Sequence, residues 1–275
     1  MLFSKAAKSL ATLAIVFVSS LAAAAPAAAN HAQPGDHVYG HRCRTYDRAV
    51  TNENTVAALI DTAGVPGAVC EIDAVTISDG TVIVWHDSTW NRVADHGTLP
   101  TGIAPRDPVR HATWAQVSQI RTKGGEPVAR LQDMIDAAGL HGIALVVDMR
   151  TPLPNPAGLV SRANQAGADV GYFQRVKSTC STRIVDRFRA AGAKIGVKLL
   201  GDCALTPAQL QARGVSFTQE LSTFTDAYLA DMQQRGIAVG VLDTYMTETL
   251  AESLVSRGVS RVLLDRPREA LSWFS

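Results

Sequence analysis

Two carboxylates on one face of an expected strand are the residues here that most directly suggest chemistry. In VCEIDAVTISDGTVIVWHD, residues 69–87, Glu71 and Asp73 are two positions apart. Residues i and i+2 of a β-strand face the same way, so the two side chains would share a face. Carboxylates this close repel each other unless a cation or a proton lies between them, and hard oxygen ligands favour Ca²⁺ or Mg²⁺ over zinc. The alternative is that one carboxylate caps the next helix and the other is solvated.

Two histidines at strand ends would flank this acidic pair. His41 ends the expected strand HVYGHR, and His86 ends the expected strand TVIVWH. Imidazole suits proton transfer because its pKa lies near neutrality. A single histidine at a strand end is more often structural, but two of them around an acidic pair indicate an acid–base couple beside a metal.

Further charged residues follow later strands. Asp148 and Arg150 stand at the end of IALVVDM and just after it, where the first could add a metal ligand and the second could hold a phosphate oxygen. An ordinary salt bridge at a strand end is the alternative for this pair. Lys198, in IGVKLL, is a weaker candidate for the same anion, and a solvated strand end explains it equally well.

The strands that would position these residues alternate with amphipathic helices. Runs rich in β-branched residues predict strands at residues 37–42, 68–75, 81–86, 143–149, 172–177, 195–200, 215–220, 238–243 and 261–265. Most helical stretches between them end in or just before glycine, which is a helix stop signal. This alternation predicts parallel strands with crossover helices. About eight such units in a single domain favour an α/β fold of the (β/α)8 TIM barrel type over an open doubly wound sheet.

Nine candidate strands compete for the eight places in such a barrel. The run VSFTQE, residues 215–220, has a polar end and is the weakest candidate. A long connection, residues 88–130, follows the third candidate strand and contains an expected helix at 113–120. Long connections in compact domains are usually functional or disordered. In a barrel this one would follow the C-terminal end of a strand and lie beside the active site.

The first 29 residues have the layout of a secretory signal peptide. Lys5 and Lys8 precede an apolar stretch, and small residues follow up to Ala29, where we expect cleavage. A membrane anchor is the alternative, but an anchor needs about 20 strongly apolar residues, and this stretch fades into alanine and contains Pro26. We therefore expect a secreted protein, extracellular or in the cell envelope, with one domain over residues 30–275 and no stable membrane anchor after cleavage.

Charge and patterning narrow the expected partners. The expected signal peptide carries two lysines and no acidic residue, so its removal changes the formal net charge from +1 to −1. A near-neutral exported protein gives no reason to expect nucleic acid or an anionic membrane as a partner. No heptad pattern and no long apolar surface helix indicates an obligate oligomer, so we expect a monomer.

The four cysteines all follow the expected signal peptide and allow two disulfides in three connectivities. Cys180 and Cys203 follow the fifth and sixth expected strands at the same end of a barrel, so we expect them to pair. Cys43 lies past the end of the first strand and would be about 10 Å higher than Cys70 at the usual rise per residue. Bridged Cα atoms are usually within about 7 Å, so we expect no Cys43–Cys70 bridge.

The order of these motifs resembles that of the glycerophosphodiester phosphodiesterase family. The family pattern runs H-R-G, E-N-T, E-L-D, a strand ending H-D followed by T and R, then E-x-K and, near the end, T-D-x-P. The matching residues here are His41-Arg42-Cys43, Glu53-Asn54-Thr55, Glu71-Ile72-Asp73, His86-Asp87 with Thr89 and Arg92, Asp148-Met149-Arg150, and Leu264-Asp265-Arg266-Pro267. Each motif is short, but their order and their placement at successive strand ends make the resemblance specific over residues 41–267.

The resemblance implies a metal-dependent barrel that hydrolyses glycerophosphodiesters to glycerol 3-phosphate and an alcohol. It implies His41 and His86 as the general acid and base. It also implies divalent-metal ligands at Glu71, Asp73 and Asp148, with Ca²⁺ or Mg²⁺ as the cofactor, and phosphate contacts from Arg42 and Arg150. Glu53 would lie at the pocket floor near the metal or the glycerol. The alternative for Glu53 is a charge at a helix N-terminus, with Asn52 or Asn54 as the cap.

Three departures from the family pattern keep other functions open. Cys43 replaces glycine, which is costly if the position needs positive φ. Asp148 is one methylene shorter than the family's glutamate, and Arg150 replaces lysine, which is not a neutral exchange at a phosphate site. One alternative is a phospholipase D-like enzyme acting on lysolipids or sphingolipids. Another is a barrel that binds a ligand without catalysis. An open apolar groove formed by residues 88–130 would favour lipids, and a polar cavity would favour small diesters.

Overall fold

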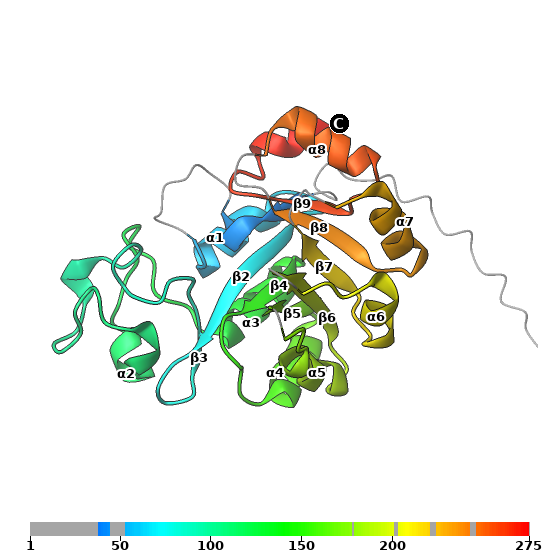
Figure 1. Ribbon diagram of the computed structural model, residues 1–275. Helices are drawn as coiled ribbons and strands as arrows, with labels where there is room; N and C mark the ends of the chain where they lie inside the picture. The colour runs from blue at the N-terminus through cyan, green and yellow to red at the C-terminus, as the bar shows by residue number, and fades with distance from the viewer. Residues whose placement is uncertain are drawn as a thin grey trace, which may run out of the picture. The chain divides into compact units, whose positions relative to one another are not determined.

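Eight parallel strands close into a barrel, which confirms the predicted fold class (Figure 1). The structure, a computed structural model, describes residues 38–44, 53–177, 179–200, 203–220, 224–242 and 246–274, and the expected signal peptide lies outside them. The barrel strands are β1 (Val38–Gly40), β2 (Val69–Thr76), β4 (Ala144–Met149), β5 (Val170–Val176), β6 (Lys194–Leu199), β7 (Phe217–Glu220), β8 (Ala238–Leu242) and β9 (Arg261–Leu264). The barrel closes because β1 pairs with both β2 and β9.

The remaining strand, β3 (Val82–Val84), is antiparallel to the end of β2 and is not one of the barrel strands. The turn at residues 77–81 is too short for a crossover to a parallel strand, which takes about a dozen residues or more. The doubt about residues 215–220 was therefore wrong, because they contain β7, and TVIVWH was the surplus candidate. The polar end of β7 fits the barrel because Gln219 is buried there, level with Lys198 of β6.

Helices between the strands cover the outside of the barrel, close to where the sequence predicted them (Figure 1). They are α1 (Val56–Ala63), α3 (Leu131–His141), α4 (Pro156–Ala166), α5 (Arg183–Ala190), α6 (Pro207–Ala212), α7 (Asp226–Gln234) and α8 (Glu248–Ser256). Threonine hydroxyls cap the N-termini of four of them, α1, α6, α7 and α8. The cap of α1 is Thr55, rather than Asn54, and Asn52 is outside the described residues. None of the helices in the described ranges is long and apolar enough to cross a membrane.

Two apolar layers hold the barrel together. The larger one lies between the strands and the surrounding helices. The smaller one fills the barrel interior and consists of Tyr39, Val69, Val146, Phe173, Phe217 and Leu263. The ring of Phe217 occupies space that a Cβ at Gly196 would overlap, so glycine is required there. Beyond this interior layer, toward the C-terminal strand ends, the inward positions become polar.

An insert, residues 77–130, follows β2 and builds its own small core beside the barrel (Figure 1, left). It contains β3, α2 (Trp114–Val117) and the 3-10 turns His96–Thr98 and Val109–His111. The helix predicted at 113–120 is therefore confirmed but shorter. Trp85 and Trp90 pack against each other in this core, with ring centroids 5.1 Å apart. The insert is thus an ordered wall next to the C-terminal end of β2.

Both disulfides form, which confirms one expectation and corrects the other. Cys180 and Cys203 pair as expected, with Cα atoms 5.3 Å apart. Cys43 and Cys70 also pair, with Cα atoms 4.8 Å apart, so the expectation that they do not was wrong. The strand register was right, since Gly40 is level with Cys70. The chain after Gly40 does not continue upward, however, because the 3-10 turn His41–Cys43 folds it back against β2.

Candidate active site

Three buried carboxylates meet at the C-terminal mouth of the barrel. Glu71 and Asp73 project from β2, and Asp148 projects from β4, level with Asp73 in the strand register. One oxygen from each lies within 4.8 Å of the others, and each residue is at most 3% exposed. The structure therefore brings together all three residues that the sequence suggested as metal ligands.

The electrostatics of this acidic triad favour a cation. Burial raises the pKa of Glu71 well above its usual value, and the charges of Asp73 and Asp148 raise it further. Burial also raises the pKa of Asp148, with the charge of Asp73 adding to the effect. Asp148 Oδ1 is buried and has no hydrogen-bond partner among the described residues. A buried carboxylate oxygen without a partner, within a dense acidic cluster, fits a hard divalent cation.

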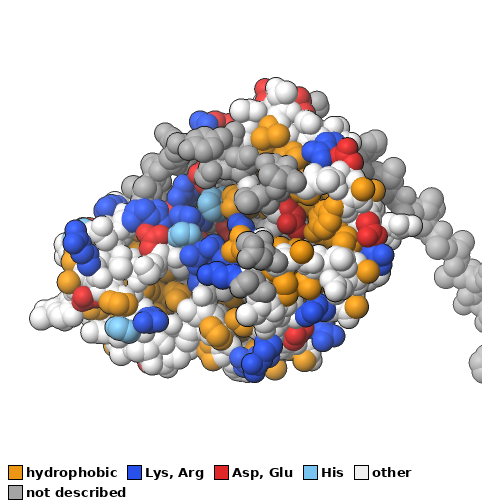
Figure 2. Space-filling view, viewed as in Figure 1, with side chains coloured by type: hydrophobic (Ala, Val, Ile, Leu, Met, Phe, Trp, Pro, Cys, Tyr) orange, Lys and Arg blue, Asp and Glu red, His pale blue; other side chains and the backbone are white. Residues whose placement is uncertain are grey.

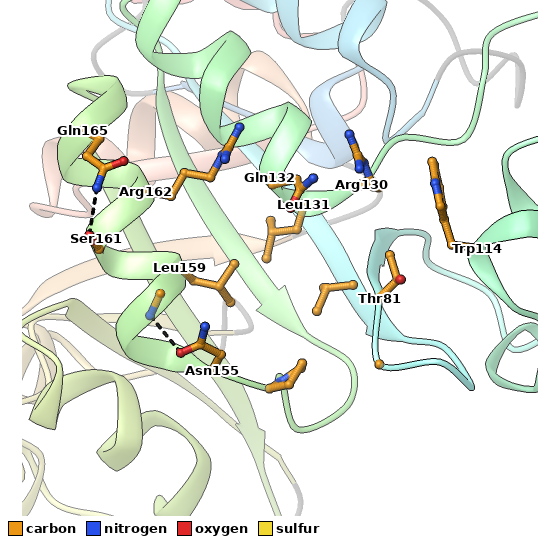
Figure 3. A pocket seen from close by; sticks show the side chains of 14 residues that line it. Thr81, Trp114, Arg130, Leu131, Gln132, Asn155, Leu159, Ser161, Arg162 and Gln165 are labelled. Carbon is orange, nitrogen blue, oxygen red and sulfur yellow. Dashed lines mark hydrogen bonds between the residues drawn. The ribbon is translucent and has the colours of Figure 1, made fainter.

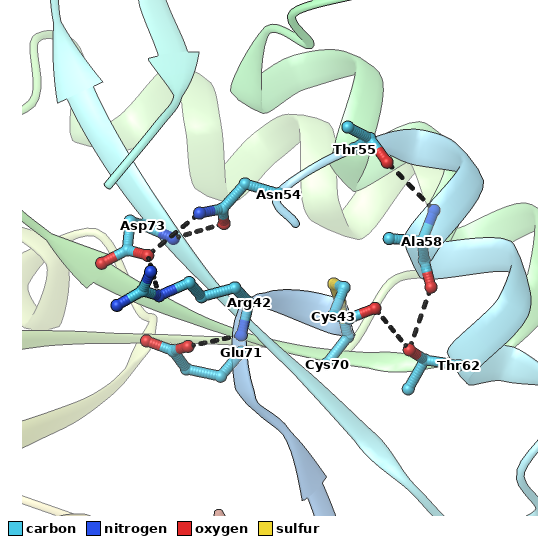
Figure 4. Close-up of a disulfide and its surroundings, with 9 residues drawn as sticks. All are labelled: Arg42, Cys43, Asn54, Thr55, Ala58, Thr62, Cys70, Glu71 and Asp73. Atoms are coloured by element: carbon cyan, nitrogen blue, oxygen red, sulfur yellow. Dashed lines mark hydrogen bonds and ion pairs between the residues drawn. A yellow bond between two sulfur atoms is a disulfide. The ribbon is translucent and has the colours of Figure 1, made fainter. Parts of the chain in front are cut away.

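The turn His41–Cys43 forms one edge of the triad (Figure 4). Arg42 and Cys43 have φ of 56° and 55°, in the left-handed region that side chains other than glycine rarely adopt. The question raised by cysteine in place of glycine is thereby answered, because this position does have positive φ. The turn lets the Arg42 backbone N–H donate to Glu71 Oε2 at 3.0 Å. The Cys43–Cys70 bridge joins this turn to the residue next to Glu71.

Each of the two histidines is held by an aspartate. His41 Nδ1 lies 2.6 Å from Asp265 Oδ1, and His86 Nδ1 lies 2.7 Å from Asp87 Oδ1. With Nδ1 protonated toward the aspartate, Nε2 of each ring is the nitrogen left to exchange a proton with a substrate. Burial lowers the pKa of His41, and the hydrogen bond with Asp265 opposes that shift.

The antiparallel hairpin, rather than a barrel strand, brings His86 to the site. The backbone N–H of Trp85 donates to the carbonyl of Asp73 at 2.8 Å, so the next residue lies near the level of the triad. The sequence prediction therefore placed His86 at the correct end of the barrel although it assigned its strand to the wrong role.

The hydrogen-bond partners of Glu53 are arginines rather than residues of the acidic triad. Its carboxylate accepts hydrogen bonds from Arg42 at 3.0 Å and from Arg92 at 2.6 Å, and it also contacts Arg44. Burial alone would raise the pKa of Glu53, but the Arg92 hydrogen bond and the charges of Arg42 and Arg44 lower it to about 2. A carboxylate that stays ionised in this way holds three guanidinium groups together.

Basic side chains also contact the triad itself. Arg150 Nη1 lies 3.4 Å from Asp73 Oδ1 and 3.5 Å from Asp148 Oδ2. Arg175, on β5, donates to Asp148 Oδ2 from Nε at 3.0 Å and from Nη2 at 2.7 Å. Lys198 is buried in the barrel, where burial and the charge of Arg175 lower its pKa, so it is not a solvated strand end.

Several residues were not assigned a role in the active site from the sequence. These are Asn54, Asp87, Arg92, Arg175 and Asp265. Asn54 donates from Nδ2 to Asp73 Oδ2 and accepts from the Asp73 backbone N–H, both at 3.0 Å (Figure 4). The signal for four of them was present, since they lie within or next to the quoted motifs. The signal for Arg175 was a charged residue at an inward position of a buried strand.

Comparison with known proteins identifies the family. The model of the glycerophosphoryl diester phosphodiesterase family matches residues 41–269, so the chain belongs to this family. Fold and family together define the protein as a phosphoric diester hydrolase, as the sequence predicted. A comparison with curated protein sequences returns no match.

Solved structures of this family have the same fold. A glycerophosphodiester phosphodiesterase from Parabacteroides distasonis aligns with a TM-score of 0.67 at 16% identity, covering 88% of this chain and 97% of that one. One from Agrobacterium tumefaciens has a TM-score of 0.66 at 19% identity, with coverage of 86% and 99%. An Oleispira antarctica phosphodiesterase in complex with the product sn-glycerol-3-phosphate has a TM-score of 0.68 at 17% identity, with coverage of 86% and 96%.

Proposed function

We propose that the protein hydrolyses glycerophosphodiesters to glycerol 3-phosphate and an alcohol, with His41 and His86 as the acid–base pair. The observation that carries this proposal is the pairing of each histidine with an aspartate at the edges of a buried acidic triad. The triad would hold one divalent cation, and its oxygen donors favour Ca²⁺ or Mg²⁺.

The protein's residues divide the chemistry between them. A cation bound by the triad would neutralise the non-bridging phosphate oxygens and the charge that develops on them in the transition state. Arg42 and Arg150 hold further phosphate oxygens. One histidine removes a proton from the nucleophile, which is water or the substrate's glycerol hydroxyl, and the other protonates the leaving alkoxide. If the hydroxyl attacks, a cyclic glycerol phosphate forms first, and water then opens it to glycerol 3-phosphate. Each such proton transfer is worth about 10²–10⁴ in rate.

Glycerol 3-phosphate release from glycerophosphocholine and glycerophosphoglycerol tests this proposal. We expect release with Ca²⁺ or Mg²⁺ and none with a chelator. His86→Ala should lower turnover about 10²–10⁴-fold, whereas His111→Ala, which removes an exposed histidine of the same insert, should leave it unchanged. Release that persists in chelator, or that His86→Ala does not reduce, would refute the proposed mechanism.

We also propose that the protein is secreted after cleavage at Ala29 and that residues 30–275 act as a monomer. Two disulfides support an oxidising compartment. Sequencing the N-terminus of exported protein tests the cleavage site, and the mass in solution tests the oligomeric state. An N-terminus upstream of residue 29, or a stable dimer, would contradict these expectations.

An apolar cavity supports a second candidate function, hydrolysis of lysophospholipids. The cavity, of about 650 Å³, lies where the β6 and β7 strand ends meet the N-termini of α6 and α7. Leu199, Leu205, Phe224 and Tyr228 line it, and they would suit an acyl chain. Turnover of lysophosphatidylglycerol below its micellar concentration, compared with glycerophosphoglycerol, distinguishes the two functions. A large preference for the lysolipid, lost in Phe224→Ser, would favour the second candidate.

A further inference from the structure

A cavity of about 440 Å³ extends from the active site to the insert. It is lined by His86 and Arg150 and also by residues 108–110 of the insert, which include Arg110. His86 is a residue of the proposed acid–base pair, whereas His41 does not line this cavity. A substituent on the phosphate next to His86 would therefore enter it.

Residues 108–110, which line the cavity from the insert, are held against the segment that follows His86. The backbone N–H of Val109 donates to the carbonyl of Ser88 at 2.9 Å, and Thr89 forms a bridge with Pro108. These contacts place Arg110 next to a segment that begins two residues after His86. Val109, next to Arg110, packs in the core of the insert, so the backbone at Arg110 is held in place relative to the segment after His86.

Polar groups without protein partners line the cavity. Within the described part of the chain, the guanidinium of Arg110 makes no hydrogen bond or ion pair, and neither do the hydroxyls of Ser88 and Thr89. Lys and Arg side chains gather around histidines where the insert meets the barrel (Figure 2). The cavity thus combines the positive charge of Arg110 with hydroxyl groups that can donate to and accept from a ligand. The carboxylate of Asp87 also lines it but is already paired with His86 and Arg92.

A second cavity, between the hairpin turn, α3 and α4, shows the contrast (Figure 3). Its two arginines already have acidic partners, because Arg130 pairs with Asp133 at 2.8 Å and Arg162 pairs with Asp136. This second cavity therefore offers no uncompensated positive charge to an anion.

We propose that the cavity from His86 to Arg110 binds the leaving alcohol and selects a small hydroxylated alcohol that carries a negative charge. This inference rests on the proposed function and specifies its substrate class. His86 would then protonate the leaving alkoxide. Arg110 would bind the carboxylate or phosphate on that alcohol, and Ser88 and Thr89 would bind its hydroxyls. A quaternary ammonium head group would be disfavoured by the like charge of Arg110.

Four diesters that differ only in the alcohol test the inference: those of glycerate, glycerol phosphate, glycerol and choline. The wild-type protein should prefer the two anionic alcohols, and their separate values show whether carboxylate or phosphate is bound. Arg110→Ala should raise KM about five- to tenfold for the anionic diesters, as expected for loss of one charged contact. The KM for the choline diester should stay the same or fall, and kcat should change little.

Arg106→Ala is the matched control, because Arg106 is an exposed arginine of the insert that does not line the cavity. Equal effects of Arg110→Ala on all four diesters, equal effects of the two variants, or a wild-type preference for choline would each overturn the inference. Calorimetric binding of the same diesters in chelator separates this inference from the proposed function. Binding in chelator that depends on Arg110 and on negative charge, combined with no turnover when Ca²⁺ or Mg²⁺ is supplied, would refute the proposed function but keep the selectivity.

Discussion

Removing the Cys43–Cys70 disulfide should damage the active site as well as stability. The bridge holds the turn in which Arg42 and Cys43 both have positive φ and in which the Arg42 N–H contacts Glu71. Left-handed backbone costs a residue other than glycine about 1–2 kcal/mol. Without the bridge, the turn can relax to a cheaper conformation, which would move His41 and free Glu71 from its backbone donor.

The loss of stability follows from loop length. The bridge spans a sequence separation of 27, so the loop-closure entropy gives about 3.5 kcal/mol in the chain-entropy model. For a domain of this size the melting temperature should fall by roughly 7–14 °C. The Cys180–Cys203 bridge spans a separation of 23, so its removal should cost nearly the same. The two double alanine variants therefore match in stability and differ in what their bridges hold.

The effect on activity should separate the two bridges. Each left-handed residue of the turn costs about 1–2 kcal/mol of conformational free energy, so the turn should relax when the bridge is removed. We therefore expect kcat/KM of Cys43→Ala/Cys70→Ala to fall about tenfold or more. Cys180→Ala/Cys203→Ala should keep nearly full activity at the same temperature. Cys43→Gly/Cys70→Ala should recover part of the loss, because glycine adopts positive φ without strain.

Circular dichroism melting and steady-state kinetics, both well below the lower melting temperature, provide the assay. Full activity in Cys43→Ala/Cys70→Ala would refute the argument that the bridge holds the turn. An equal loss of activity in both double alanine variants would refute it as well, since the cause would then be general destabilisation.

Three further predictions concern single residues. Asp265→Asn should lower kcat by about 10²–10⁴, because the amide no longer favours the His41 tautomer that presents Nε2 as a base. It should also move the acid limb of kcat/KM to lower pH, since burial lowers the pKa of His41 and the lost hydrogen bond raised it; an unchanged pH–rate profile would contradict this. Gly196→Ala should cost about 1–3 kcal/mol in denaturant unfolding, because its Cβ would overlap the ring of Phe217, and adding Phe217→Leu should restore part of the loss. Burial raises the pKa of Glu71, so the folded protein keeps a proton that the unfolded chain releases above about pH 4.5. In chelator, stability should therefore fall as pH rises above that value, and thermal melts of Glu71→Gln should show a shallower fall.

The site was predicted where side chains share a strand face and was missed where distant segments meet. Glu71 and Asp73 are two residues apart on one strand, so strand periodicity alone predicted that they face the same way. Glu53 was expected near the metal or the glycerol, and its arginine partners, which include Arg92, 39 residues along the chain, were not predicted. No local pattern predicts such a contact. Likewise, the partner of His41 is Asp265, 224 residues away.

The barrel itself was largely predictable because it depends on local signals. Alternating strand and helix patterns, with glycine after most helices, determined the order of elements and the fold class. The exception was β3, because the length of the turn that precedes it decides whether the strand is a parallel barrel strand or forms an antiparallel hairpin with β2. The short turn at residues 77–81 contained that information, but the apolar pattern of residues 81–86 is the same for either arrangement.

Residue types and short-range spacing were enough to predict the fold class, the family and the members of the acidic triad. The three-dimensional structure was needed to show how the chain after β1 folds back to join Cys43 to Cys70, and which carboxylate holds each histidine. It was also needed to show that Glu53 pairs with arginines and that Arg110 lines the same cavity as His86. These features depend on backbone turns and on contacts between segments that are far apart in the sequence. Such contacts exist only once the barrel has closed, so no local pattern of residues predicts them.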